Sequence, residues 1–277
     1  MESMRTVLTI AGSDSSGGAG IQADIKTIQA HKLFATSVIT AITAQNTMGV
    51  RSVQEISPEI VRDQIDAVFE DIHPDAVKIG MVSSPGIVEA IAQGLAHHDA
   101  RHVVVDPVMV ATSGSDLIKT EAIEALESML FPLAEVITPN IPEAEALSGI
   151  KIADLPDMVQ AGHAIADRIR ESAGGKHAPA ILVKGGHALG DARQSDDLLF
   201  QPDGTVTWLR GDRIDNPNAH GTGCTLSSAI ACGLACGQDV ERACRAAKAY
   251  ITEALAFGLD LGQGSGPLDH MCRYRVR

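Results

Sequence analysis

Short apolar stretches rich in β-branched residues alternate along the chain with longer segments whose apolar residues recur at helical spacing. Such alternation is typical of a parallel sheet that is covered by helices on both faces. The pattern predicts six strands, at residues 5–11, 37–43, 76–81, 102–106, 134–138 and 180–184. These strands are sufficient for a doubly wound α/β sheet.

Several helices have recognisable starts. Ser57-Pro58 and Ser84-Pro85 each combine an N-cap residue with a proline in the first turn. Residues 120–130 and 154–171 are amphipathic, and the apolar run 226–234 predicts a helix directly after Cys224.

The stretch SDDLLFQPDGTVTWL follows the sixth predicted strand and differs from the strands before it. Two apolar runs separated by Asp203-Gly204 are typical of a β-hairpin. We therefore expect an antiparallel hairpin at one edge of an otherwise parallel sheet.

Glycines and polar residues follow each predicted strand. In chain order these are GSDSSGGAG, Ala44-Gln45-Asn46, Met81, Asp106-Pro107, Pro139-Asn140 and Gly185-Gly186-His187. Taken singly, each group has the composition of an ordinary turn. Ligands of open α/β sheets bind outside the carboxyl ends of the strands, so the six groups together predict one binding site.

Composition and charge narrow the possible partners. The chain has 277 residues, which a single domain can accommodate, with 45% hydrophobic and 21% charged residues. The formal net charge is -13 and the pI is about 5.1, which disfavours nucleic acid and anionic membranes as partners. We see neither an apolar run long enough to span a membrane nor a cleavable signal pattern, and we expect a cytoplasmic protein.

The five cysteines do not resemble a disulfide framework or a zinc site, because their number is odd and they form no CxxC pair. Cys232, Cys236 and Cys244 are expected to be small core residues. Cys224 is the exception because of the glycine-rich loop that precedes it.

The first glycine-rich loop does not match a P-loop, since no lysine follows its glycines. Residues 18–23 do satisfy GxGxx[GA] after a strand, but residues 35–47 contain no acidic residue to bind a ribose. A dinucleotide dehydrogenase is therefore disfavoured. The loop can still bring backbone N–H groups close to a small ligand, with Asp24 one turn into the following helix.

The stretch HGTGCTLS, residues 220–227, is the better candidate for an anion site. Gly221, Thr222 and Gly223 form a loop whose N–H groups can converge, and the following helix adds its positive end. A cysteine at such a helix start is expected to have a lowered pKa, which would make Cys224 a base or a nucleophile. The alternative is a glycine-rich helix cap with an incidental cysteine.

Carboxylates beside a phosphate site usually indicate Mg²⁺. Asp106 and the pair Asn140 and Glu143 are suitably placed at strand ends. Glu143 and Glu145 could equally be first-turn acids that face a helix dipole. Lys184 and His187 follow the sixth strand, where a lone histidine is more often structural.

The chain resembles a known family in motifs that run from residue 10 to residue 270. They are AGSDSSGGAGIQADIKT, VITAITAQNTMGV, VVDPVM, ITPNIPEAE, VKGGH, HGTGCTLSSAI and GSGPLDH. They closely resemble the bacterial hydroxymethylpyrimidine/phosphomethylpyrimidine kinases of thiamine synthesis, members of the ribokinase-like superfamily. The resemblance implies one kinase domain over residues 1–277, folded as a three-layer α/β/α sandwich with a mostly parallel sheet and an antiparallel edge hairpin.

The same resemblance implies a reaction. ATP and Mg²⁺ would be used to phosphorylate 4-amino-5-hydroxymethyl-2-methylpyrimidine on its hydroxymethyl oxygen, and then to convert the monophosphate into the diphosphate. A homodimer is also expected from the family. In many relatives a threonine precedes the histidine of the HGTGC loop, whereas Ala219 stands here.

Site residues carried over from the family fall into four groups. The pyrimidine pocket would comprise Gly12, Asp24, Gln45, Met81 and Val108. Cys224 would lie beside the attacking hydroxyl, with Gly221, Thr222 and Gly223 as the anion hole. ATP would be bound by Asn140, Lys184, His220 and Lys248, and the metal region would involve Glu143 and Asp106. An amide that carries both a donor and an acceptor, as Gln45 does, suits an aminopyrimidine edge.

Two alternatives remain at this point. A pyridoxal kinase shares the HGTGC loop and phosphorylates a hydroxymethyl group on a similar flat ring, although Gln45 and Met81 favour the pyrimidine. A non-catalytic ligand-binding protein that retains the fold is the other alternative, because a fold does not fix a function.

Overall fold

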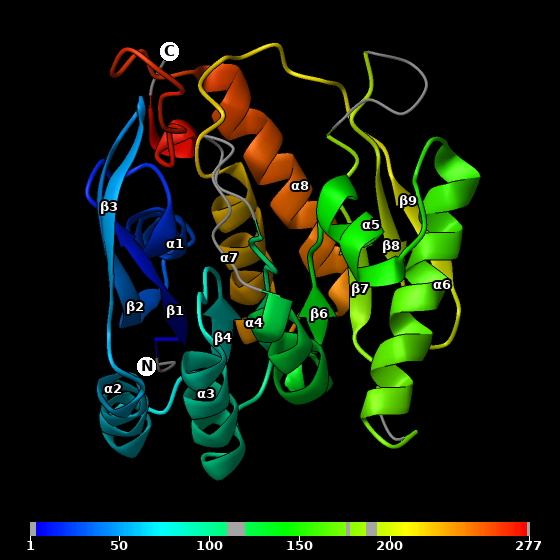
Figure 1. Cartoon of the computed structure of the whole chain (residues 1–277). Coiled ribbons are helices and arrows are strands. Elements are labelled where there is room, and N and C mark those ends of the chain that lie inside the picture. The colour runs from blue at the N-terminus through cyan, green and yellow to red at the C-terminus, as the bar shows by residue number, and fades with distance from the viewer. Residues whose placement is uncertain (1–3, 110–119, 176–177, 187–192, 276–277) are drawn as a thin grey trace.

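The computed structural model describes residues 4–109, 120–175, 178–186 and 193–275 (Figure 1). Within these ranges one sheet contains nine strands in the order β3-β2-β1-β4-β5-β6-β7-β8-β9. His187, one of the residues expected at a strand end, lies outside the described residues.

The centre of the sheet is parallel, as predicted from the apolar runs. Its strands are β1 (Thr6–Asp14), β2 (Phe34–Asn46), β4 (Ala76–Ile79), β5 (Val103–Val105), β6 (Val136–Ile137) and β7 (Ala180–Val183). At one edge β8 (Asp197–Phe200) and β9 (Val206–Leu209) pair antiparallel, which confirms the predicted hairpin.

The other edge was not predicted. β2 continues to Asn46, and β3 (Gly49–Glu55) folds back antiparallel along it. Most residues of β3 are exposed on both faces, so the strand lacks the alternation that marks a half-buried one. The pairing shifts register between Ala44 and Gln45, an irregularity of the kind that redirects a side chain.

Helices cover both faces of the sheet (Figure 1). One face carries α1 (Gly20–Ala30), α7 (Thr222–Ala235) and α8 (Val240–Phe257). The other carries α2 (Pro58–Asp71), α3 (Pro85–His97), α4 (Thr120–Ala125), α5 (Ile141–Ser148) and α6 (Leu155–Ser172). This is the expected three-layer α/β/α architecture.

The predicted helix starts correspond to observed caps in part. The Ser57 side chain accepts a hydrogen bond from the Ile60 N–H, whereas Ser84 makes no side-chain cap bond. Asp154 and Asp157 form a capping box at the start of α6. The segment predicted as one helix over 120–130 is α4 followed by a π-helical turn, Leu126–Leu130.

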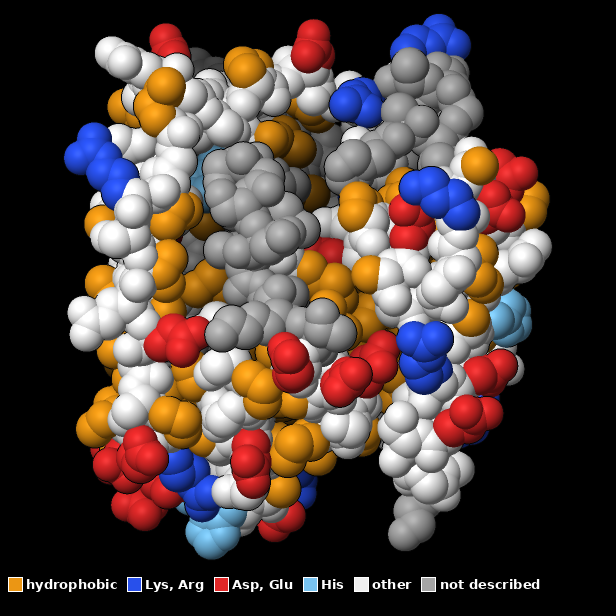
Figure 2. Space-filling view, viewed as in Figure 1, with side chains coloured by type: hydrophobic (Ala, Val, Ile, Leu, Met, Phe, Trp, Pro, Cys, Tyr) orange, Lys and Arg blue, Asp and Glu red, His pale blue; other side chains and the backbone are white. Residues whose placement is uncertain are grey.

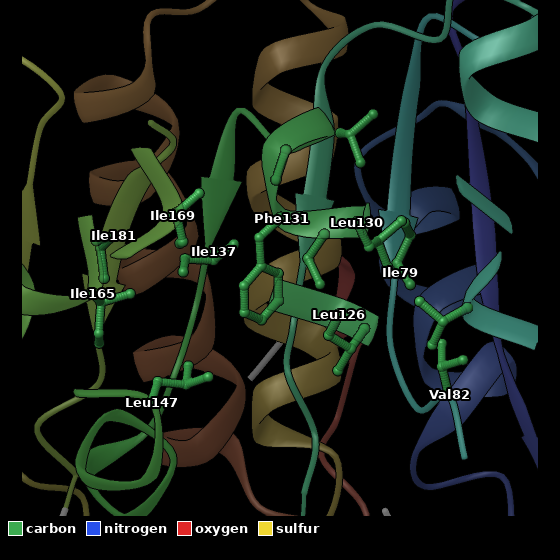
Figure 3. Packing of buried hydrophobic residues seen from close by; sticks show 14 of the residues in the cluster. Ile79, Val82, Leu126, Leu130, Phe131, Ile137, Leu147, Ile165, Ile169 and Ile181 are labelled. Atoms are coloured by element: carbon green, nitrogen blue, oxygen red, sulfur yellow. The ribbon is translucent and has the colours of Figure 1, made fainter. Parts of the chain in front are cut away.

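Each face of the sheet packs against its own hydrophobic core. Alternate side chains of β1 enter different cores, with Val7 beneath α7 and α8 and with Leu8 and Ile10 facing the other layer. Figure 3 shows the core beneath α2 to α6, in which Phe131 lies among aliphatic side chains from the strands and helices. Burial of these side chains is the main stabilising contribution and holds the strand ends in fixed positions.

No described helix is both long and apolar enough to cross a membrane. Figure 2 shows acidic and basic side chains interspersed over one face of the molecule.

Candidate active site

The carboxyl ends of β5, β6 and β7 bring three charged side chains together. Lys184, directly after β7, lies with Nζ 2.7 Å from Oδ1 of Asp106 and 4.0 Å from Oε2 of Glu143. The Thr138 hydroxyl donates to the same Asp106 oxygen at 3.0 Å. The strand ends therefore converge as predicted, and one lysine lies between two carboxylates.

Glu143 is a buried helix-capping residue. Its Oε2 accepts the backbone N–H of Asn140 at 2.8 Å, and the Asn140 side chain accepts the N–H of Glu143 at 2.9 Å. Burial raises the pKa of Glu143 to about 6, with Lys184 opposing and Asp106 adding to that increase. Glu145 instead binds Lys151 at the surface, so only the first of the two acids belongs to the cluster.

The start of α7 contacts this cluster. Gly221 is the N-cap of the helix and has a φ of 85°, a left-handed conformation that favours glycine. A Cβ on Gly223 would lie 3.0 Å from Oδ2 of Asp106 and 3.4 Å from Nζ of Lys184. The Thr222 hydroxyl donates to the Ala219 carbonyl at 2.6 Å, so it orders the loop. The first N–H groups of a 14-residue helix thus begin beside Lys184.

Cys224 differs from the prediction. Withdrawal from water raises the pKa of its thiol to about 11, and the negative charges of Asp24 and Asp106 add to this, whereas Lys78 opposes it. The helix start does not lower the pKa, because burial and two carboxylates outweigh it. Cys224 is therefore a neutral thiol at pH 7.

Lys78 of β4 and Asp24 of α1 form a fully buried ion pair. Nζ lies 2.9 and 2.8 Å from the two carboxylate oxygens, and both side chains are 0% exposed. Thr9 and Ser228 also donate to Asp24, at 2.6 and 2.7 Å. The expectation that Asp24 lines the substrate pocket is corrected, because its oxygens are committed to these partners.

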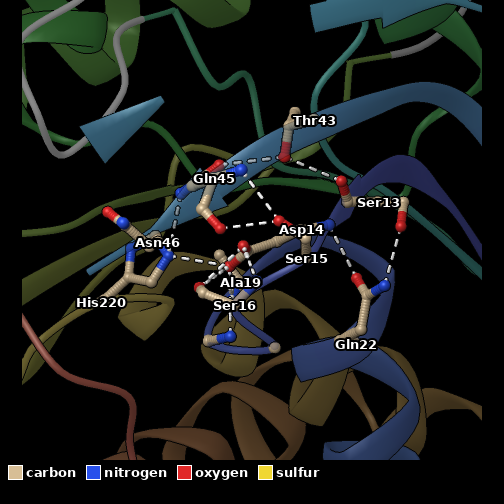
Figure 4. Close-up of polar contacts among 12 residues, drawn as sticks. Ser13, Asp14, Ser15, Ser16, Ala19, Gln22, Thr43, Gln45, Asn46 and His220 are labelled. Atoms are coloured by element: carbon tan, nitrogen blue, oxygen red, sulfur yellow. Dashed lines mark hydrogen bonds and ion pairs between the residues drawn. The ribbon is translucent and has the colours of Figure 1, made fainter. Parts of the chain in front are cut away.

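A second polar cluster lies at the ends of β1 and β2 (Figure 4). Asp14 accepts hydrogen bonds from the His220 ring at 2.9 Å and from the backbone N–H groups of Ser16 and Ala19, both at 2.8 Å. Burial alone would raise the pKa of Asp14, but the bonds from His220, Ser16 and Ala19 outweigh it and lower the pKa to about 2. Asp14 is ionised throughout the physiological range and fixes the first loop.

Gln45 belongs to this second cluster. Its backbone N–H donates to the Ser15 hydroxyl at 2.8 Å, and its carbonyl accepts from the same hydroxyl at 2.7 Å. Its side chain lies 3.2 Å from both the His220 ring and the Thr43 hydroxyl (Figure 4). His220, expected at the nucleotide, therefore lies with Gln45 and Asp14, because its ring hydrogen-bonds to the Asp14 carboxylate.

The two glycine-rich loops pack directly on each other. A Cβ on Gly221 would collide with the Gly18 carbonyl, and one on Gly18 would lie 2.5 Å from Cδ2 of His220. Gly12 is equally close to the side chain of Met81, whose Cε would be 2.6 Å from an added Cβ. Val108, like Met81, is partly exposed just beyond its strand. The expected pocket residues other than Asp24 thus lie at or near the carboxyl ends of their strands.

Lys248 lies near the antiparallel edge. Its Nζ is 2.7 Å from Oδ2 of Asp197 and 2.6 Å from the Ser195 carbonyl. Together with Gly211, Arg245 and Thr252 it lines a hollow between β9 and α8. Burial raises the pKa of Asp197 above its ordinary value, and Lys248 and, more weakly, Lys184 oppose that increase. Asp197 therefore interacts with both lysines.

Several contributors were missed in the sequence. Asp14, Thr43 and Lys78 have no role in the predicted site. A lysine inside the four-residue strand AVKI was a visible signal, because a buried charge requires a partner. Cys236, expected in the core, is exposed at the end of α7, whereas Cys232 and Cys244 are buried as predicted.

The chain is similar to known proteins over almost its whole length. The family model described as phosphomethylpyrimidine kinase matches residues 14–269. A hydroxymethylpyrimidine/phosphomethylpyrimidine kinase of Rhizobium meliloti is 51% identical over 270 residues, covering 96% of this chain and 97% of its own.

Two similar solved structures have different activities. A phosphomethylpyrimidine kinase of Clostridium difficile is 47% identical with a TM-score of 0.77, over 90% of this chain and 99% of its own. The pyridoxal kinase of Staphylococcus aureus, solved with AMP-PCP and pyridoxal, is 33% identical with a TM-score of 0.86, over 99% of this chain and 96% of its own.

Proposed function

The chain belongs to the phosphomethylpyrimidine kinase family, and we propose that it phosphorylates 4-amino-5-hydroxymethyl-2-methylpyrimidine and then its monophosphate, with ATP as the donor. One observation carries this proposal. Gln45, whose amide suits an aminopyrimidine edge, is held 3.2 Å from His220, the residue that leads directly into the Gly221–Cys224 loop. Ring recognition and phosphate binding are thus connected within one loop.

In the proposed reaction the hydroxymethyl oxygen attacks the γ-phosphorus of ATP. The new P–O bond forms as the bond to the β-phosphate oxygen breaks, ADP departs, and the hydroxyl proton passes to an oxygen of the transferred phosphoryl group. The N–H groups of Gly221 and Gly223 and the ammonium of Lys184 would stabilise charge on the transferring phosphoryl group, whereas the Thr222 N–H donates to the Ala219 carbonyl at 3.3 Å. With its pKa near 11, Cys224 would hold the hydroxyl in place, and the proton would leave late in a loose transition state.

The residues at the phosphate end fit a Mg²⁺ ion. Burial and the nearby Asp106 disfavour ionised Glu143, so an added cation would be stabilised between two carboxylates that share one lysine. Asp106 and Glu143 would hold the ion, which would neutralise phosphate charge when bound. The described residues contain no cluster of three or more His, Cys, Asp or Glu suited to a metal, so phosphate oxygens and water would complete the ligand set.

The nucleotide would extend from the cluster toward the antiparallel edge of the sheet. Lys184, Asn140 and Lys248 are the proposed contacts, and Asp197 interacts with both lysines. The Staphylococcus aureus pyridoxal kinase supports this use of ATP, since its structure contains AMP-PCP. We also propose a single kinase domain over residues 1–277, a homodimer and a cytoplasmic location, as the family resemblance implies.

Pyridoxal phosphorylation is the second candidate, favoured by the TM-score of 0.86 with a pyridoxal kinase. It is less supported, because the pyrimidine kinases match at higher identity. A non-catalytic role is disfavoured by the joint presence of Cys224, the glycine loop and the Lys184 cluster.

The test is ADP release with Mg-ATP and three acceptors offered separately: hydroxymethylpyrimidine, its monophosphate and pyridoxal. We expect both pyrimidines to be turned over well above pyridoxal. If pyridoxal were the best acceptor, the chain would be a vitamin B6 salvage kinase. ADP release with none of the three, despite measurable pyrimidine binding, would indicate the non-catalytic role.

A further inference from the structure

In the orientation shown in Figure 4, the Gln45 amide places its oxygen opposite another acceptor and its NH₂ group opposite another donor. The Thr43 hydroxyl lies 2.9 Å from the Ser13 carbonyl and 3.2 Å from Oε1 of Gln45. Both of these atoms are acceptors, and a hydroxyl has a single hydrogen to donate. The shorter bond, to Ser13, takes that hydrogen and leaves the Thr43 oxygen as an acceptor facing another acceptor.

The opposite end of the amide has the complementary conflict. Nε2 of His220 lies 2.9 Å from Oδ2 of Asp14 and 3.2 Å from Nε2 of Gln45. Asp14 is ionised and accepts only, so Nε2 of His220 carries a hydrogen whether the ring is neutral or charged. An NH₂ group of Gln45 would then face an N–H, and two donors would meet.

A half-turn of the amide about its last bond exchanges oxygen and nitrogen and resolves both conflicts. We infer that Asp14, His220 and Thr43 are positioning residues that fix the Gln45 amide with its oxygen toward His220 and its NH₂ toward Thr43. The Thr43 oxygen then accepts from the amide, and the His220 N–H is shared between Asp14 and the Gln45 oxygen.

This orientation determines what Gln45 offers to a ligand. Among the described residues, one N–H and one lone pair of the amide remain without a partner on a side chain that is only partly buried. A 4-aminopyrimidine presents a ring-nitrogen acceptor beside an amino donor, which pairs with that N–H and that oxygen, much as glutamine pairs with adenine. A 4-oxo ring presents the reverse order, a donor beside an acceptor.

A free amide could turn to pair with either ring, but a fixed amide cannot. The 4-oxo ring would have to turn over, and its hydroxymethyl group would then move away from Cys224. The orientation of Gln45 therefore selects the amino over the oxo form of the acceptor. This selection rests on the proposed function, whereas the orientation of the amide does not.

The first experiment removes the acceptor that forces the His220 hydrogen into place. Oδ2 of Asp14 also accepts the Gly18 and Ala19 N–H groups, so an asparagine would keep its oxygen toward the ring. Asp14→Ala instead removes the acceptor, so Nε2 of His220 can become an acceptor and release the amide. The measurement is kcat/KM, with KM and kcat separated, for hydroxymethylpyrimidine and its 4-oxo analogue. We expect the wild-type preference for the amino compound to be at least about tenfold, the size of one bidentate pair, and to fall about tenfold in the variant through KM.

The matched control is Gln22→Leu. Gln22 accepts the Asp14 backbone N–H and donates to the Ser13 hydroxyl, both at 2.8 Å, without touching the Asp14 carboxylate. It should change kcat/KM for both acceptors by the same factor. An unchanged preference in Asp14→Ala, or an equal loss of preference in Gln22→Leu, would overturn the inference.

A second measurement needs neither turnover nor a folded Asp14 variant. Nitrogen-15 NMR of the full-length wild type, labelled at histidine, reports which ring nitrogen of His220 carries hydrogen, with His220→Gln identifying the signal. We expect hydrogen on Nε2. A bare Nε2, with hydrogen only on Nδ1, would refute the amide orientation even if the chain phosphorylates the pyrimidine. If Nε2 carries hydrogen but the protein phosphorylates another alcohol, only the proposed function would be contradicted.

Discussion

The two ends of the site are built on different physical principles. At the recognition end, formed by the first loop, Gln45 and His220, an ionised Asp14 is saturated with hydrogen bonds and its pKa is lowered to about 2. At the phosphate end, formed by Asp106, Glu143 and Lys184, two carboxylates share one lysine, and the pKa of Glu143 is raised to about 6.

This difference indicates a different role for each end of the site. A saturated network is rigid and presents a fixed pattern of donors and acceptors, which favours discrimination between rings. An unbalanced charge cluster is stabilised by an incoming cation and its phosphate, which favours binding of a metal nucleotide. Changes at the recognition end should therefore alter KM and selectivity, and changes at the phosphate end should alter kcat and the response to pH.

Cys224→Ala should have the largest effect. The thiol lies at the start of α7 beside the proposed attacking hydroxyl, and loss of that contact misplaces the nucleophile. We expect kcat to fall by about 10²-fold or more with little change in KM for the pyrimidine. Cys236→Ser, at an exposed cysteine, should leave both unchanged. Full turnover by Cys224→Ala would show that Cys224 does not position the attacking hydroxyl.

Gly221→Ala tests whether the two glycine-rich loops constrain each other. The added Cβ would collide with the Gly18 carbonyl and would occupy a φ of 85°, whereas Gly237→Ala meets nothing within 4 Å at a φ of 77°. We expect the free energy of unfolding to fall by about 1 kcal/mol in Gly237→Ala and by about 3 kcal/mol in Gly221→Ala. Equal losses in denaturant titrations would show that the loops do not constrain each other.

Glu143→Gln tests the charge imbalance through pH. The folded pKa of about 6 exceeds the ordinary 4.5, so this group stabilises the fold fully below pH 4.5, and that stability is lost as pH rises through 6. Relative to Glu143→Gln, the free energy of unfolding of the wild type should decline by about 2 kcal/mol between pH 4 and 7.5.

Glu145→Gln is the control for that experiment, because Lys151 and the Ile152 N–H lower the pKa of Glu145 and its contribution has the opposite sign. Parallel stability curves for the wild type and Glu143→Gln would contradict the account of the phosphate end.

Much of the fold follows from local pattern. The β-branched runs that became β1, β4, β5, β6 and β7 are buried on both faces, so their apolar composition was sufficient to predict them. β3 escaped because an exposed edge strand has no such composition. Its position depends on pairing with β2, which is a tertiary property.

The positions of site residues at strand ends could be predicted from the sequence. Properties that depend on residues distant in the sequence could not. The convergence of Asp106, Glu143 and Lys184 followed from the strand order of a parallel sheet. The raised pKa of Cys224 did not, because it depends on burial and on carboxylates distant in the sequence. His220 was assigned to the nucleotide from the family resemblance, and only the fold places it beside Asp14.

We propose that Gln45 recognises the ring without taking part in phosphoryl transfer. The steady-state kinetics of Gln45→Leu with hydroxymethylpyrimidine and with pyridoxal test this role. We predict that KM for the pyrimidine rises about tenfold, the size of one lost bidentate pair, while kcat is maintained and the weaker pyridoxal reaction is unchanged. An equal loss with both acceptors, or a loss confined to kcat, would contradict the claim.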